Sequence, residues 1–235
     1  MTAGDNGYMV IETSNVGTAL QPNQPNPLSP VIPVNFKPTD SLVDPNRPVI
    51  YLTDNTNRRI YAVNYKTLTV SFIQVDLPPE RMAFANNELY VTLMQRGNQN
   101  SLSQESTGKV GIIDANSFNL TKEIPLNMIP DDIAIEGGNI YIAAYTKDGI
   151  KINSFSCSTG QIVDKTTQIS EAYTSNVNLN NSHLYYPGER LLDSQGFPRL
   201  IVSGDKLYLI EEDLYSRSIL NVYVYNVTNS IWSFS

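Results

Sequence analysis

The sequence predicts an all-β protein built from repeated antiparallel sheets of four strands. Three observations predict this fold: a composition that favours strands, an apolar pattern with a period of two, and a motif that recurs along the chain. Tyr is the commonest aromatic residue, with 14 Tyr against 7 Phe and 1 Trp. Tyr, Val, Ile and Thr are all favoured in strands. No segment repeats the apolar spacing of a helical face.

The recurring motif has three clear copies. Each copy reads as the end of a strand, a crossing that contains proline, a short alternating strand, a turn, and a second strand opened by an aliphatic residue and a tyrosine. The copies cover residues 32–54, 73–92 and 124–143, and their tyrosines are Tyr51, Tyr90 and Tyr141. These tyrosines are about 39 and then about 51 residues apart, a spacing typical of sheet-sized repeats.

A second element follows each tyrosine. It consists of a strand, a short polar turn that ends in Ser or Thr, and an outer strand. Its copies begin at Ile60, Val110, Ile152 and Leu220. Short polar side chains in such turns can bond neighbouring backbone amides. The two elements together supply the four strands of one sheet. Complete four-stranded copies are predicted at about residues 40–75, 80–125 and 130–169. Residues 175–235 form either one sheet with an insertion or two sheets, one of them degenerate. Asn176–Leu179 and His183–Tyr186 indicate one strand pair in this stretch, and residues 199–202 and 206–210 indicate another.

A sheet of this kind has two apolar faces, and radial stacking around an axis buries both. A two-sheet sandwich would explain the alternation but not the recurring crossing and tyrosine. We therefore predict a β-propeller of four or five blades over residues 31–235. Residues 1–30 are predicted to be an extended arm, because residues 21–30 are rich in Pro and Asn. The chain could form a small ring, a ring closed by the N-terminal strand 31–36, or part of a larger assembly.

At these residues the chain resembles a known family. The run from Val49 to Asp54, with the crossing before it, resembles the YVTN-type β-propeller repeat, and Tyr90, Val91 and Thr92 form a second partial match. The resemblance covers about residues 30–169 well and 175–235 loosely. It implies a propeller of the kind found in surface-layer and secreted proteins. Related propellers include lactone hydrolases, but no catalytic motif of theirs is matched.

Composition excludes several kinds of function. A formal charge of −7 makes nucleic acid an unfavourable partner. With one cysteine, Cys157, and one histidine, His183, the chain has no intrachain disulfide and no multi-histidine metal site. No run approaches the roughly 20 apolar residues of a membrane helix, so we expect no membrane span. The N-terminus has neither a basic nor an apolar region, which predicts no signal peptide.

Acidic residues follow the proline in each crossing: Asp40, Glu80, and Asp131 with Asp132. Crossings of this kind gather at one end of a propeller's central channel. Three carboxylates aimed at one axis could bind a hard cation such as calcium. The alternative is that each carboxylate starts a strand and stays hydrated. No other cofactor is predicted.

A second candidate site lies near the insertion at residues 187–197. Tyr185, Tyr186 and Arg190 are residue types favoured in protein interfaces, although they also suit blade packing. We predict a non-enzymatic surface or structural protein of a cell envelope or virion. Its propeller would bind a protein partner, a ligand or further copies of itself outside the cell. The alternative is a hydrolase of the metal-dependent lactonase type, which needs the acidic set.

Overall fold

The computed structural model describes residues 2–3, 8–10, 31–94, 107–146, 149–157, 161–164, 198–212, 219–227 and 231–234. Every regular element among these residues is a β-strand, and the strands form five antiparallel sheets. In four of them, four consecutive strands pair in chain order. These are called the first to fourth sheets. The fifth has three short strands and is called the N-terminal sheet.

The strand bounds are as follows. The first sheet contains β4 (Asp40–Val43), β5 (Val49–Asp54), β6 (Arg59–Asn64) and β7 (Thr69–Gln74). The second contains β8 (Pro79–Ala85), β9 (Glu88–Met94), β10 (Gly108–Asp114) and β11 (Asn119–Leu126). The third contains β12 (Asp132–Glu136), β13 (Asn139–Thr146), β14 (Gly149–Ser156) and β15 (Ile162–Asp164). The fourth contains β16 (Pro198–Ser203), β17 (Lys206–Glu212), β18 (Ile219–Asn226) and β19 (Ile231–Phe234).

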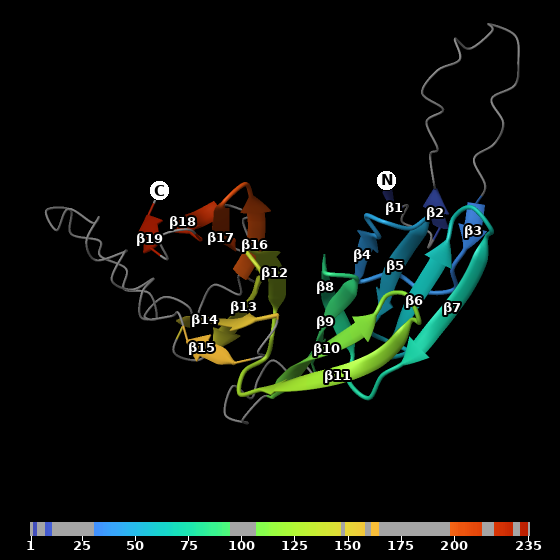
Figure 1. Ribbon diagram of the computed structural model, residues 1–235, viewed down its shortest axis with the longest axis horizontal. Coiled ribbons are helices and arrows are strands. Elements are labelled where there is room, and N and C mark those ends of the chain that lie inside the picture. The colour runs from blue at the N-terminus through green and yellow to red at the C-terminus, as the bar shows by residue number, and fades with distance from the viewer. Residues whose placement is uncertain are drawn as a thin grey trace, which may run out of the picture.

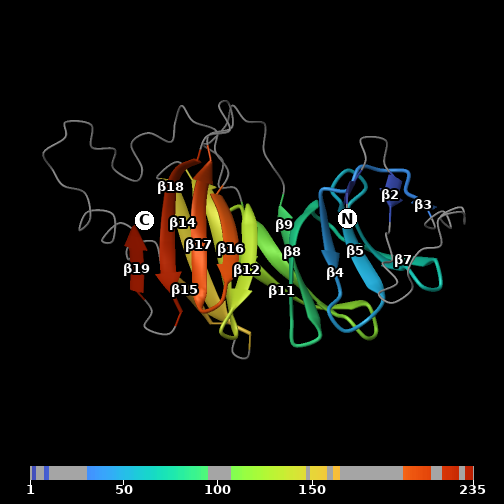
Figure 2. The same cartoon turned by 90° about the horizontal axis from the view of Figure 1, so that it is seen from above.

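The four sheets follow an arc, with the first strand of each sheet on the concave side (Figure 1). Strand β4 contacts β8, β8 contacts β12, and β12 contacts β16, so successive sheets meet at their innermost strands. Figure 2 shows the same sheets in chain order when the molecule is seen from above. This is the radial arrangement of propeller blades, and it confirms the predicted fold class. The part of the chain that the structure describes forms an open arc of four blades.

The N-terminal sheet lies at one end of the arc. It pairs β1 (Thr2–Ala3), β2 (Tyr8–Val10) and β3 (Val31–Pro33) in chain order. Two strands therefore form inside the predicted arm, while the domain boundary at residue 30 stays a prediction. Ile32 is buried, and it packs with Phe36 against Ile50 and Val63 of the first sheet. The N-terminal sheet thus occupies the position of a preceding blade.

The core lies between the blades. One apolar cluster joins the first and second sheets, another the second and third, and another the third and fourth. The predicted tyrosine anchors Tyr51, Tyr90 and Tyr141 are all buried in these clusters. The Tyr51 ring lies 6.3 Å from Phe84 of β8 and 6.0 Å from Phe118, which is in the turn between β10 and β11. Each fully buried side chain of this size contributes roughly 1.5–3 kcal/mol by leaving water.

The tight turns have the local chemistry that the sequence indicates. Asn86 and Asn87 have φ values of 51° and 65°, and Gly137 and Gly138 have 57° and 73°. Two successive positive φ values are the signature of a type I′ hairpin turn, which favours Asn and Gly. In the first two sheets, the last residue of the third strand closes the turn before the outer strand. Asn64 at the end of β6 and Asp114 at the end of β10 each accept hydrogen bonds from two backbone N–H groups of that turn.

Candidate functional site

Four charged residues occupy one equivalent position on the four innermost strands. Asp40, Asp132 and Arg199 each pair with the residue two places after their sheet's tyrosine anchor. Arg81 occupies the same position in the second sheet. Its backbone N–H donates a hydrogen bond to Thr92 Oγ1, just as the backbone N–H of Asp40 donates one to Thr53 Oγ1. We call these four residues the axial quartet. Their charges alternate in sign from each blade to the next.

The two aspartates of the axial quartet bond the blade that follows. Asp40 Oδ2 accepts the N–H of Met82 at 2.8 Å, and Asp132 Oδ2 accepts the N–H of Leu200 at 2.8 Å. The second carboxylate oxygen accepts the N–H of the next residue in its own strand, at 2.9 Å in both blades. Each carboxylate therefore fastens two neighbouring innermost strands together.

The arginines stand beside these carboxylates. Arg81 Nη1 lies 3.8 Å from Asp40 Oδ1, and Arg199 Nε lies 3.9 Å from Asp132 Oδ2. Burial raises the pKa of both carboxyl groups, and it outweighs the backbone hydrogen bonds and the two guanidinium groups that lower it. Arg81 acts on Asp132 as well as on Asp40. Arg199 likewise lowers the pKa of both Asp40 and Asp132, so the charges of the axial quartet act on one another across the blades.

The predicted acidic set has a different geometry from the one expected. Glu80 accepts a hydrogen bond from Asn55 through its side chain, and its carbonyl accepts one from Thr53. The N–H of Asp131 bonds the Ala143 carbonyl. Within the described ranges, no three His, Cys, Asp or Glu side chains gather as metal ligands. The structure therefore does not bring Asp40, Glu80 and Asp131 together, and cation binding stays a prediction.

The predicted contact residues Tyr185, Tyr186 and Arg190 lie outside the described residues.

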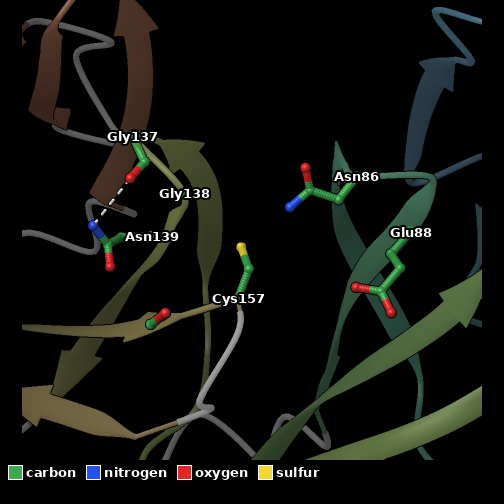
Figure 3. Close-up of a pocket in the computed structure, with 7 residues that line it drawn as sticks. Asn86, Glu88, Gly137, Gly138, Asn139 and Cys157 are labelled. Carbon is green, nitrogen blue, oxygen red and sulfur yellow. Dashed lines mark hydrogen bonds between the residues drawn. The ribbon is translucent and has the colours of Figure 1, made fainter.

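An open pocket of about 610 Å³ lies at the opposite ends of the innermost strands, between turns of the second and third sheets. Figure 3 shows the Asn86 amide and the Cys157 thiol pointing into the space between these turns. The remaining lining residues are Glu88, Gly137, Gly138, Asn139 and Ser156. Beneath them, the buried Tyr90 hydroxyl donates a hydrogen bond to Glu88. The sequence motifs did not indicate this pocket, because its residues come from turns of two separate copies.

The surroundings of the Cys157 thiol disfavour its reactive thiolate form. Burial raises the pKa of Cys157, although its hydrogen bond with Tyr90 opposes this. The thiolate is the reactive form of cysteine, so a raised pKa makes the group less reactive. Burial and the bond to Glu88 also raise the pKa of the Tyr90 hydroxyl. The arrangement suits a small polar binding pocket between blades.

An apolar strip runs along β7, the outermost strand of the first sheet. Val70 and Phe72 are 48% and 51% exposed. The Arg59 guanidinium lies over the Phe72 ring, 4.4 Å from its centroid. Phe72 packs beside Tyr61, which stacks on Phe36. We call Arg59, Tyr61, Val70 and Phe72 the β7 strip.

No protein-family model matches the chain, and no curated protein matches it. Solved structures do match. A hydrazine synthase from Kuenenia stuttgartiensis aligns over 84% of this chain and 49% of its own length, with a TM-score of 0.56 and 17% identity. The WD40 domain of Neurospora crassa Pan2 aligns over 83% and 50%, with a TM-score of 0.50 and 16% identity. BamB from Moraxella catarrhalis aligns over 86% and 50%, with a TM-score of 0.50 and 12% identity.

These likenesses show the class of the protein, which is a β-propeller. The chain spans about half the length of each of the three structures, in agreement with an arc of four blades. Across the ranges given above, no helix is long and apolar enough to cross a membrane.

Proposed function

We propose that this chain is a non-catalytic propeller scaffold that binds a protein partner along the edge of its first sheet. The observation that carries this proposal is the β7 strip. Aromatic residues and arginine are enriched where protein interfaces bind most strongly. Here they gather around an apolar pair, Val70 and Phe72, that is half exposed to solvent.

The edge of β7 is also unusually open to pairing. Edge strands are normally protected from other chains by charged residues, prolines or bulges. The equivalent strand of the second sheet, β11, carries Lys122, Glu123 and Pro125, and its register shifts at a bulge. Strand β7 carries no charged residue and no proline, and its pairing with β6 is regular. An extended segment of a partner could therefore add to β7 as a further strand.

The setting that we propose is the surface of a cell or a virion, as part of an envelope or structural assembly. The YVTN-like residues around Tyr51 and Tyr90 support this setting, because that repeat is typical of surface-layer and secreted proteins. The acidic composition and the abundance of Asn, Ser and Thr suit a solvated surface protein. The partner is a protein, and the protein acts by binding.

The test uses the purified chain as bait for proteins extracted from its source, identified by mass spectrometry. Phe72→Lys adds a protecting charge to β7 and removes the ring beneath Arg59. Thr121→Lys adds the same charge to β11, which is already protected, and serves as the matched control. A partner retained by the wild type and by Thr121→Lys, and lost with Phe72→Lys, supports the proposal.

Two outcomes would overturn it. One is a set of captured proteins that is identical for all three baits. The other is hydrolysis of lactones that requires calcium and is lost with Asp40→Asn, which would support the lactonase alternative.

A further inference from the structure

Two side chains of the axial quartet, Arg81 and Arg199, have N–H donors that no described residue accepts. Arg81 Nη1 lies 3.8 Å from Asp40 Oδ1, and Arg199 Nε lies 3.9 Å from Asp132 Oδ2. Hydrogen bonds between charged groups are about 2.7–2.9 Å long, so both contacts are ion pairs without a hydrogen bond. No hydrogen bond joins either guanidinium to another described residue. A guanidinium carries several N–H donors in a fixed planar fork, and here they are available to a ligand.

The two carboxylates of the quartet are fully engaged by comparison. Each oxygen of Asp40 and of Asp132 accepts one backbone N–H, at 2.8 or 2.9 Å. The backbone therefore fixes the position of both carboxylates, and the groups that still lack a partner at the axis are donors. A ligand that completes this site has to supply hydrogen-bond acceptors.

Both guanidinium groups act at one place, although they belong to the second and fourth blades. Burial raises the pKa of Asp40 and of Asp132, and against this effect each guanidinium lowers both pKa values. Charges on a protein surface act on one another strongly only within about 10 Å. The four side chains therefore gather around one axis, on the concave side of the arc where the innermost strands lie (Figure 1). The side chains of Arg81 and Arg199 are 31% and 46% exposed, so a solute can reach them.

We propose that Arg81 and Arg199 together bind the carboxylate group of a small organic acid at the axis of the arc. Guanidinium groups bind carboxylate and phosphate through paired N–H···O bonds. A carboxylate suits this site better than a phosphate does, because phosphate carries more negative charge near neutral pH. Asp40 and Asp132 repel any anion that approaches the arginines, and they repel the more highly charged one more strongly.

A purely structural role for the two arginines would be to offset the charge of the buried aspartates. Arg47 shows the geometry that such a role takes in this protein, because its Nε lies 2.7 Å from Asp44 Oδ2 and donates a hydrogen bond to it. The ion pairs of the axial quartet are longer, at 3.8 and 3.9 Å. The N–H groups of Arg81 and Arg199 are therefore not committed to the aspartates in the way that Arg47 is.

The test measures the binding of acetate through the nuclear magnetic resonance signals of the arginine Nε–H groups. The signals of Arg81 and Arg199 are identified as those lost in Arg81→Lys and Arg199→Lys, which keep the positive charge. Acetate added to the wild type, with the ionic strength held constant by chloride, should shift both signals to a plateau. In each Lys variant, the acetate concentration that gives half of the shift of the remaining signal should rise roughly tenfold, the effect of losing one charge-assisted hydrogen bond.

Arg58→Lys is the matched control. Arg58 is exposed in the turn before β6, and its Nη1 already donates a hydrogen bond of 2.9 Å to the Asp76 carbonyl. The Arg58 signal should not move with acetate, and Arg58→Lys should bind acetate as the wild type does. Phe72→Lys should also leave acetate binding unchanged, because the β7 strip takes no part in this site. Failure here and failure of the proposed partner binding are therefore separate results.

Three outcomes would count against the proposal. Signals of Arg81 and Arg199 that shift no more than that of Arg58 would overturn it. Lower stability of Arg81→Lys and Arg199→Lys to urea, with acetate binding unchanged, would show that the arginines only offset buried charge. Tighter binding of inorganic phosphate than of acetate would overturn the assignment of the ligand as a carboxylate.

Discussion

Asp132 Oδ2 accepts the backbone N–H of Leu200 at 2.8 Å, although 68 residues separate them in the chain. Asp40 and Met82 repeat this relationship between the first two blades, also at 2.8 Å. Both bonds join innermost strands, where the blades are closest together. The blades are therefore held at the axis by directed polar bonds as well as by the apolar clusters farther out.

The first prediction concerns this bond. Asp132→Ala should lower the free energy of unfolding by about 2 kcal/mol, because the buried Leu200 N–H loses its acceptor. Asp132→Asn should cost less, since its amide oxygen can still accept. The measurement is urea unfolding followed by circular dichroism. Asp205→Ala, at an exposed turn, should change the free energy by less than about 0.5 kcal/mol. Equal effects at positions 132 and 205 would contradict the blade-joining role.

The second prediction concerns pH. Burial raises the folded-state pKa of Asp132, so folding takes up a proton between the ordinary Asp pKa, about 3.9, and the raised value. The contribution of this group to stability is therefore fully present below about pH 4, and it is lost as the pH rises through the raised pKa. The difference in unfolding free energy between the wild type and Asp132→Asn should therefore shrink as the pH rises.

Asp44 gives the opposite sign and serves as the comparison. Burial acts to raise its pKa, but hydrogen bonds from the Asn46 N–H, Tyr51 and Arg47 outweigh burial and lower it. The stability that it contributes is present above about pH 4, and it is lost as the pH falls through the lowered pKa. Unfolding curves of the wild type, Asp132→Asn and Asp44→Asn should be measured from about pH 3 to 7, roughly the range in which carboxyl groups titrate. As the pH rises, the difference in unfolding free energy between the wild type and Asp132→Asn should shrink, and the difference between the wild type and Asp44→Asn should grow. Parallel curves would contradict both assignments.

The third prediction concerns the buried Tyr51 hydroxyl. It donates a hydrogen bond of 2.8 Å to Asp44, whose side chain is fully buried and also accepts Arg47 Nε at 2.7 Å. Tyr51→Phe should cost about 1–3 kcal/mol of unfolding free energy, because it leaves a buried carboxylate oxygen with one partner fewer. Tyr61→Phe removes a hydroxyl that accepts a long hydrogen bond of 3.5 Å from Arg59 Nη1, and it should cost much less. Similar melting temperatures for the two variants would show that the hydroxyl of Tyr51 is unimportant.

The fourth prediction separates steric crowding from backbone strain. A Cβ at Gly108 would lie 2.3 Å from Pro130 Cδ and 2.9 Å from the Leu93 carbonyl oxygen, so Gly108→Ala should cost about 3 kcal/mol. Gly204 has a φ of 63° but open space around it, so Gly204→Ala should cost only about 1 kcal/mol. Thermal unfolding of both variants gives the comparison. A reversed order would contradict this account of the crossing before the third sheet.

Much of the fold could be predicted from the sequence because the repeat is local. The strand after each crossing pairs with the strand that carries the tyrosine, so Tyr51, Tyr90 and Tyr141 could be aligned from the sequence alone. The last copy was predicted at residues 199–202 and 206–210, and both ranges lie in strands of the fourth sheet. Asn176–Leu179 and His183–Tyr186, which suggested another strand pair, lie outside the described residues.

The polar positions were harder to predict. The proline spacing aligned Asp40 with Glu80 and Asp131, whereas the backbone pairing aligns Asp40 with Arg81 and Asp132. Asp132 follows Asp131 directly in the third crossing, whereas in the second crossing Glu80 lies one residue before the aligned position, and in a strand a shift of one residue moves a side chain to the other face. A register irregularity between Pro79 and Met82 causes part of this shift, and nothing in the residue types reveals it.

The contacts between sheets given above join only blades that are neighbours in the chain. Each blade is also completed by strands that follow one another directly. A blade can therefore assemble as soon as its own residues have left the ribosome, against the blade made just before it. The molecule would grow one blade at a time during synthesis, and the fourth blade would expose Ile201 and Tyr208 to solvent until another surface meets them.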